Sequence, residues 1–379
     1  MDVDVAVVGA GPAGSTLAAL LAQRGVSVAL IDRDTFPRDK LCGEFLSYDA
    51  LPILDLLGVT PAIDEQQSPH ITQCRVVSRH RTYSFDFPHA ARGVSRLFLD
   101  DLLFRAAVGA GAMPVAGATA TELGPGRIGT SSGEVRARVV VGAWGRWGRF
   151  DTQLQRGFVS DRSHRNFGFK RHYRGTSHGD TIELYSFRRG YLGVAAIEGG
   201  LTNICGLVHA SRIQHLKGRW DAFIDTIRGE EPTLEALYAH AEPAQEQFLS
   251  SEPVIFRARS AVEGGIFMVG DASGVIDPLT GNGMAMAIQS ALVAAPFILD
   301  ALAGRDTAAA YRQRHRDFFA NRIRWSRRVA FLLSRPALLD AALTAVRGRA
   351  AGDLLLRRTR ADRDAIARLA DSWARTRNA

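Results

Sequence analysis

Apolar runs separated by glycine-bounded turns divide the first part of the chain into clear elements. Val3 to Val8 is a short apolar run that ends at a glycine, which predicts a buried parallel strand. Residues 15–25 predict a helix that stops at Gly25, and residues 26–32 predict a second buried strand. Together these segments predict a βαβ unit, the start of a doubly wound sheet.

The pattern changes between about residues 150 and 252. Short β-rich runs at 181–187, 190–197 and 202–208 are separated by turn signals, which predicts a meander of antiparallel strands. A buried strand returns at 265–269, and the chain is mostly helical afterwards. We therefore predict the α/β class: a doubly wound (Rossmann-like) domain, interrupted by an inserted antiparallel β-sheet and followed by a helical C-terminal tail.

Composition supports a folded chain and narrows its partners. The 379 residues are 46% hydrophobic and 23% charged, which is ordinary for a globular protein. The formal net charge is +8, with many arginines near the C-terminus, yet no zinc-finger or RNA-binding signature accompanies them. We expect no nucleic-acid partner and at most weak peripheral membrane contact, because the arginines fit a solvated helical surface.

The few cysteines and the chain's start indicate a cytoplasmic protein. Cys42, Cys74 and Cys205 form an odd, sparse set that fits a reducing compartment, and no pair has metal-ligand spacing. The N-terminus begins a strand without a basic region, so we expect no signal peptide. The cysteine spacing leads us to expect no metal site. The apolar stretch 283–304 contains polar residues and a proline, and it is expected to be a buried helix.

The first motif predicts a dinucleotide site. Residues 9–14 read Gly-Ala-Gly-Pro-Ala-Gly between the predicted strand and helix. Gly9 permits the tight turn, Gly11 lets the backbone approach a pyrophosphate, and Gly14 allows close packing of helix on strand. Asp32 ends the second strand and is suited to bind a ribose hydroxyl. The residues predicted to hold this half of the cofactor are Gly9, Gly11, Pro12, Ala13, Gly14, Asp32 and Arg33.

A second motif separates FAD from NAD. Gly270-Asp271-Ala272 follows the late strand, and the segment 277–283 reads Asp-Pro-Leu-Thr-Gly-Asn-Gly before a long helix. FAD needs such an element because its ribityl chain and flavin ring extend beyond the pyrophosphate. Asp271 can bind ribityl hydroxyls, and a helix N-terminus can stabilise negative charge on reduced flavin. The predicted residues of this half are Gly270, Asp271, Pro278, Gly281, Asn282 and Gly283.

These motifs resemble those of the FAD-dependent monooxygenases related to para-hydroxybenzoate hydroxylase, a superfamily that includes geranylgeranyl reductases and flavin-dependent halogenases. Arg96 matches an arginine that commonly touches FAD in that family. Trp144 stands where the family usually has aspartate, so the reductant, with NAD(P)H as the candidate, stays open. The resemblance implies an FAD-binding domain in two parts (1–150 and 254–305), a β-rich substrate domain (151–253 with part of 60–95) and a helical C-terminal region (306–379).

The segment around Cys42 resembles the Cys-Gly segment of the reductase branch, beside the flavin. Cys42 is therefore a candidate cofactor contact and proton donor, and Glu44 a candidate general acid or base. Two reactions compete: oxygen-dependent hydroxylation, which we favour, and C=C reduction with a proton from Cys42. A flavoprotein that serves maturation of another protein is a more distant alternative.

The substrate is expected to be a hydrophobic small molecule, aromatic or polyketide-like and from secondary metabolism, because no cluster of buried charges predicts an anion pocket. Candidate contacts on the inserted sheet are Phe167, Tyr185, Tyr191 and Asn203. We do not expect a halogenase, because the chain lacks the Gly-Trp-x-Trp-x-Ile-Pro segment typical of those enzymes. Their active-site lysine also has no evident counterpart, since Lys40 alone lies near a flavin motif.

Overall fold

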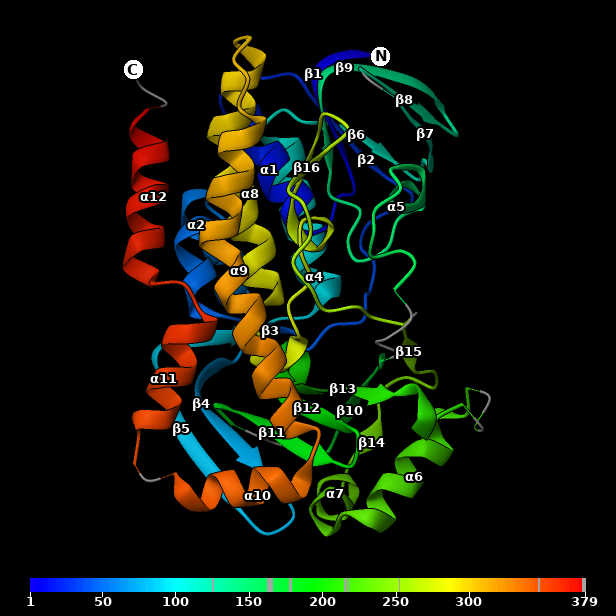
Figure 1. Ribbon diagram of the computed structural model, residues 1–379, viewed down its shortest axis with the longest axis vertical. Helices are drawn as coiled ribbons and strands as arrows, with labels where there is room; N and C mark the ends of the chain where they lie inside the picture. The colour runs from blue at the N-terminus through cyan, green and yellow to red at the C-terminus, as the bar shows by residue number, and fades with distance from the viewer. Residues whose placement is uncertain are drawn as a thin grey trace.

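Two β-sheets, each assembled from strands distant in sequence, form the two halves of the molecule in the computed structural model (Figure 1). The structure describes residues 1–124, 126–161, 166–176, 179–214, 216, 218–251, 253–346 and 348–376.

The first sheet is the predicted doubly wound sheet. β1 (Asp2–Val8) pairs in parallel with β2 (Val28–Asp32) on one side and β9 (Gly133–Gly142) on the other. The sheet order is β16 (Val262–Glu263), β17 (Ile266–Met268), β9, β1, β2 and β6 (Met113–Ala116). β8 (Arg127–Thr130) also pairs with β9, and β7 (Ala120–Gly124) pairs with β8. Val5 and Val7 pack toward α1 (Pro12–Ala22) and α8 (Gly283–Leu302), which confirms the predicted βαβ start.

The second sheet contains the predicted meander. β11 (Thr181–Phe187), β12 (Gly190–Ile197) and β13 (Leu201–His209) pair antiparallel in turn, so the three predicted strands are confirmed. The full order is β14 (Glu242–Pro243), β10 (Asn166–Arg174), β13, β12, β11, β4 (His70–Val77), β5 (Thr82–Gly93) and β3 (Phe45–Leu46), with β15 (Leu249–Ser250) beside β10. The second sheet therefore combines β3, β4 and β5, which precede β6 to β9 of the first sheet in sequence, with β10 to β15, which follow them.

The two faces of the second sheet have different neighbours. α6 (Trp220–Glu230) and α7 (Pro232–Tyr238) cover the outer face, where Phe169, Tyr185 and Phe187 form a cluster with Phe223. The inner face is turned to the first half of the molecule. Because side chains alternate along a strand, the residues between those aromatics lie on the inner face.

The C-terminal helices span both halves. α9 (Ala308–Leu333) packs on α8 and reaches the second sheet, where α10 (Pro336–Ala345) and α11 (Ala350–Thr359) lie against β11 and β5 (Figure 1). α12 (Arg363–Arg375) lies against α2 (Leu51–Leu56) of the first half. By length and composition α8 could cross a membrane, but most of it is buried in the protein core, as predicted for residues 283–304.

A buried polar network ties these helices together at Asp49. Its Oδ2 accepts hydrogen bonds from Gln289 Nε2 (3.0 Å) and from the backbone N–H of Ala361 (2.9 Å). Arg322 Nη1 donates to Gln289 Oε1 (2.7 Å) and lies 4.0 Å from Asp49 Oδ2. Both charged side chains are nearly inaccessible to solvent, so each depends on the other for compensation.

Asp49→Ala is expected to lower the free energy of unfolding by about 3–5 kcal/mol, because it leaves the buried Arg322 without its acid. Asp300 is a matched control, since its pair with Arg305 is exposed, and Asp300→Ala should cost about 1 kcal/mol or less. Denaturant unfolding of both variants measures the difference. Equal losses would contradict the role of Asp49 as the central anion of the network.

Candidate functional site

The glycine-rich loop is held open toward the position expected for a pyrophosphate. Gly9 has φ of +110°, and a Cβ there would lie 2.3 Å from the carbonyl oxygen of Ala143. A Cβ on Gly14 would lie 1.8 Å from the carbonyl oxygen of Gly9, so helix and strand approach too closely for a side chain. At Gly11 the nearest atoms to such a Cβ are at 3.9 Å, which leaves the backbone accessible to a ligand.

Asp32 fixes the loop from the end of β2. Its Oδ2 accepts a hydrogen bond from the backbone N–H of Ala10 (2.7 Å), and its Oδ1 accepts one from Asp34 N–H (3.0 Å). The carboxylate thereby stays at the carboxyl edge of the sheet beside the loop. Arg33, also predicted to bind the cofactor, has a largely exposed side chain that pairs with Asp34 at 3.7 Å.

Two arginines face Gly11 and share one buried acid. Asp100 receives Arg96 Nε at 2.6 Å and Arg96 Nη2 at 2.7 Å, and Arg38 Nη1 at 2.7 Å. Burial opposes the charge on Arg96, but Asp100 outweighs it and raises the pKa of the guanidinium above its ordinary value. Both guanidinium groups lie equally near the open side of Gly11, at 3.9 and 4.0 Å from where a Cβ on this glycine would lie. Arg38 was not predicted, because no motif in the sequence marks it.

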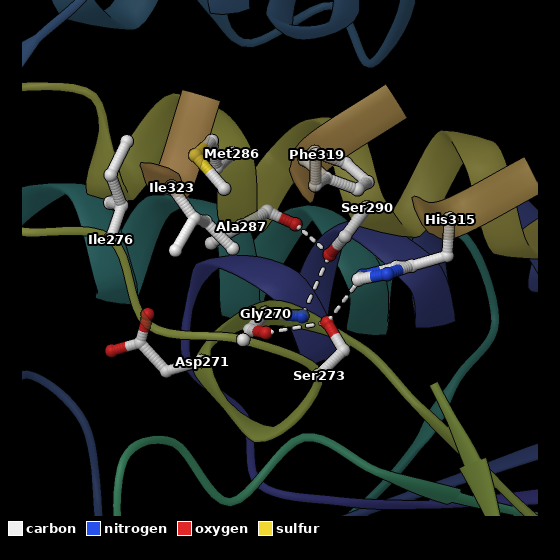
Figure 2. Close-up of a pocket in the computed structure, with 11 residues that line it drawn as sticks. Gly270, Asp271, Ser273, Ile276, Met286, Ala287, Ser290, His315, Phe319 and Ile323 are labelled. Atoms are coloured by element: carbon white, nitrogen blue, oxygen red, sulfur yellow. Dashed lines mark hydrogen bonds between the residues drawn. The ribbon is translucent and has the colours of Figure 1, made fainter. Parts of the chain in front are cut away.

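The second motif forms a rigid turn that leaves one carboxylate free. The backbone N–H of Gly270 donates to Ser290 Oγ (2.7 Å), and Ser273 Oγ donates to the carbonyl of Gly270 (2.7 Å). His315 Nε2 lies 2.9 Å from Ser273 Oγ, and burial lowers the pKa of this histidine to about 4. Figure 2 shows Asp271 turned away from this cluster.

The Asp271 carboxylate fits a ligand rich in hydroxyl groups. Burial raises the pKa of this carboxyl, and no described side chain or backbone group hydrogen-bonds to it. Asp271 is only partly buried, so its carboxylate is accessible to a group that donates to it, as ribityl hydroxyls would. The open loop at Gly11, the two arginines and this acceptor together fit FAD.

The loop before α8 contacts the second sheet. Gly281 has φ of +62° and packs against Phe45, because a Cβ on this glycine would lie 2.8 Å from the phenyl ring. Asn282 is fully buried and donates from Nδ2 to the carbonyl of Thr359 (2.6 Å). α8 begins at Gly283, so its first N–H groups are free of intrahelical partners. Pro278, at the start of the loop, is exposed.

A buried charge cluster lies on the inner face of the second sheet and contains Glu44. Glu44 Oε1 accepts from Lys170 Nζ (2.6 Å) and from the backbone N–H of Arg96 (2.9 Å), and Oε2 lies 2.7 Å from His172 Nε2. Lys170 also pairs with Asp39 at 2.7 Å. Burial opposes the charge on Lys170, but the two acids outweigh it and raise the pKa of the ammonium. Glu44 adopts φ of +54°, a strained conformation for a non-glycine residue that this cluster stabilises.

Cys42 lies at the edge of the same cluster. Its Sγ accepts a hydrogen bond from the backbone N–H of Glu44 (3.4 Å), and its carbonyl accepts one from Asn203 Nδ2 (3.0 Å). Burial raises the pKa of the thiol, so Cys42 is protonated at neutral pH. It can therefore donate a proton or a hydrogen bond but is poorly suited to act as a nucleophile.

The four predicted substrate contacts divide between the two faces of the sheet. Asn203 and Tyr191 lie on the inner face, and Tyr191 Oη donates to Asp277 Oδ1 (2.6 Å) in the flavin loop. Tyr185 is paired in register with Leu192, the neighbour of Tyr191, so it lies on the outer face. Phe167 is also on the outer face, packed toward α6. The structure therefore corrects the placement of these two aromatics beside the flavin.

Lys170 and His172 were missed by the sequence analysis, although a signal was present. They alternate along β10 with Phe169 and Arg171, so the period of two separates a polar inner pair from an outer pair. Trp144, in the place of the family's aspartate, donates from Nε1 to Asp151 Oδ1 (3.2 Å) and packs on Phe150.

Comparison with known proteins gives a family match over most of the chain. Residues 2–326 match the family described as FAD binding domain. Conditioned medium factor receptor 1 of Dictyostelium discoideum is 28% identical over 91% of this chain and 74% of its own length. Tryptophan 2-halogenase of Chondromyces crocatus is 25% identical over 86% of this chain and 67% of its own length.

A similar fold is found in the myxobacterial chondrochloren halogenase CndH, a variant of FAD-dependent halogenases, with a TM-score of 0.78 and 19% identity over 98% of this chain and 96% of that one. The expectation from the sequence that this chain is not a halogenase is therefore wrong, because halogenases are among the similar proteins in both sequence and fold. Its lysine argument also fails: Lys170, distant from the motifs in sequence, lies in the Cys42–Glu44 cluster.

Asp32→Ala is expected to weaken FAD binding by about 1–3 kcal/mol, since it removes an acceptor from both the ligand and the loop. Titration of FAD into the apoprotein measures the affinity. The neighbouring exposed Arg33→Ala is the matched control and should bind FAD as the wild type does. Unchanged affinity in Asp32→Ala would remove this carboxylate from the cofactor site.

The shifted pKa of Asp277 predicts that the stability of the protein depends on pH. Burial raises its pKa from 3.8 to about 6, although Tyr191 and the Leu279 N–H partly oppose the shift. The folded state therefore binds this proton more tightly than the unfolded chain, and stability falls as pH rises from about 4 to 6. Relative to Asp277→Asn, the wild type should lose about 3 kcal/mol of unfolding free energy across this window. Denaturant unfolding of both proteins at several pH values measures this loss, and parallel pH profiles would contradict it.

Proposed function

The chain belongs to the FAD-binding domain family of FAD-dependent oxidoreductases, and from this premise we propose that it uses oxygen to hydroxylate a hydrophobic, aromatic or polyketide-like small molecule. The observation that carries the proposal is the buried cluster of Cys42, Glu44, Lys170 and His172. It lies between the flavin loops and the inner face of the second sheet, where a substrate would meet the cofactor.

The chain's own residues account for cofactor binding. The N–H groups around Gly11, with Arg38 and Arg96, would hold the pyrophosphate, and Asp32 the adenosine ribose. Asp271 would accept from the ribityl hydroxyls, and the N–H groups at the start of α8 would face the pyrimidine edge of the ring. The chemistry that FAD supplies when bound is two-electron transfer, from a reductant and on to dioxygen.

The buried cluster supports an oxidation in a site that excludes water. Lys170 and Glu44 are fully inaccessible, so their charges are fixed in position and weakly screened. Cys42 keeps its proton and therefore stays a neutral thiol at the edge of this site, while Asn203 holds the Cys42 carbonyl in place. Tyr191 and the apolar side chains of the inner face would contact an aromatic substrate.

Halogenation is a second candidate, favoured by Lys170. Halogenases of this superfamily use an active-site lysine, and Lys170 Nζ lies 2.6 Å from Glu44 beside the flavin loops. The similarity to Tryptophan 2-halogenase over most of the chain also supports this candidate. Both candidates need oxygen, whereas the C=C reduction considered from the sequence does not.

A single-turnover assay tests the proposal without knowledge of the electron donor. The FAD-loaded protein is reduced with dithionite, desalted and mixed with a panel of phenols, indoles and enones under ¹⁸O₂ with bromide present. Hydroxylation predicts a product that carries one ¹⁸O, and halogenation predicts a brominated product. A product with two added hydrogens, formed equally well under nitrogen, would reject both.

Cys42→Ala separates oxidation from reduction independently. If Cys42 were the general acid of a reductase, its loss would lower turnover by about 10²–10⁴-fold. In an oxygen-dependent enzyme we expect a decrease of less than about tenfold, through packing and substrate affinity. Cys205→Ala is the matched control, because this second partly buried cysteine lies on the same face and pairs in register with Lys170.

A further inference from the structure

A groove beside the flavin loop that precedes α8 contains a buried arginine that lacks a partner. The groove has a volume of about 610 Å³ and lies between β5 with its neighbour Tyr48 on one side and α11 with the start of α12 on the other. Arg360, at the end of α11, is only 9% exposed and lines this groove. Its Nε and Nη1 atoms are buried and have no hydrogen-bond partner among the described residues.

The isolation of Arg360 is unusual within this protein. Other buried arginines have polar partners: Arg92 pairs with Asp64, Arg156 with Asp151, and Arg322 with Gln289. No described carboxylate lies within ion-pair distance of the Arg360 guanidinium. Of the nearby acids, Asp49 accepts from the N–H of Ala361, and Asp362 caps α12. A buried cation without an acceptor is costly. The groove is therefore suited to a ligand that carries an acceptor for Arg360.

The surroundings of Arg360 are aromatic. Its guanidinium carbon lies 5.4 Å from the ring centroid of Phe45, 5.8 Å from that of Tyr48 and 5.3 Å from that of Phe87. These contacts hold the cation in place but satisfy none of its N–H groups. The Tyr48 hydroxyl has no hydrogen bond to the described residues, and burial raises its pKa to about 12, so it is a second donor.

Charge selects the class of ligand. Aspartates and arginines are equally represented among the residues that line the groove, and those of the outer part include the Arg349–Asp86 pair. The groove as a whole therefore has no net formal charge, and the unpaired cation is at its inner, aromatic end. One guanidinium and one phenol hydroxyl match a single carboxylate better than a doubly charged phosphate.

We propose that this groove binds an aromatic monocarboxylate, with the acid group on Arg360 and Tyr48 and the ring against Phe87. The site adjoins the flavin loop, since Phe45 contacts Gly281 and the residue before Arg360 accepts a hydrogen bond from Asn282. This goes beyond the proposed oxidation, and it adds an acidic group to the hydrophobic ligands that the sequence led us to expect.

The test compares 2-naphthoate with its neutral isostere 2-naphthamide by calorimetry on the FAD-loaded protein at pH 7. The wild type should bind 2-naphthoate about tenfold or more tightly than the amide, since only the acid forms a charge-assisted pair. Arg360→Gln should abolish that preference. Arg357→Gln, an exposed arginine on the same helix and groove, is the matched control and should retain it.

Two further measurements keep the proposal falsifiable. Arg360→Gln should unfold at a temperature no lower than the wild type, because it removes an uncompensated buried charge, so lost binding cannot be attributed to unfolding. Tyr48→Phe should weaken 2-naphthoate but leave 2-naphthamide nearly unchanged. Equal affinity for both probes in the wild type, or a preference that survives in Arg360→Gln, would overturn the site. Binding is measured without turnover, so failure of the oxidation assay would leave this result intact.

Discussion

The carboxylate of Glu44 is the group on which the position of the second sheet relative to the first half of the molecule depends. Lys170 and His172 reach it from β10 of the second sheet, and the backbone N–H of Arg96 reaches it from the first turn of α4 (Arg96–Gly109). Because the group is fully buried, losing Lys170 would leave the charge of Glu44 without its cation in a low dielectric. The same carboxylate thus positions the inner face of the sheet and the start of the helix that carries Arg96 toward the glycine-rich loop.

Local patterns were sufficient for the cofactor-binding half and for the meander. The strand, glycine loop and Asp32 follow one another within 32 residues, so hydrophobic period and turn chemistry determine them nearly alone. The partners of Glu44 are different, since Lys170 is 126 residues away and its pairing depends on how the sheet docks. No pattern in one sequence encodes that docking, which is why Glu44 was identified as a candidate without its partners.

Alternation along a strand predicts two faces but not which face is turned to the flavin. Tyr185 and Tyr191 were both plausible contacts, and only the position of α6 and α7 decides between them. The aromatic cluster around Phe223 packs with α6 and α7 on one face, which leaves the face with Lys170 for the site. In a sheet rich in aromatic residues, a prediction from the sequence therefore favours the aromatic side chains and misses polar ones such as Lys170 and His172.

α11 and the residue that follows it join the site although they lie beyond the family match, which ends at residue 326. The carbonyl of Thr359 accepts a hydrogen bond from Asn282 of the flavin loop, and the next residue stacks on Phe45, which packs against Gly281. Cofactor binding thus rests on the part shared with the family, and the walls around the flavin loop are partly built by the tail. Proteins that share the FAD-binding part can differ in the molecules they accept because the tail can change without altering the glycine loops, Asp32 or Asp271.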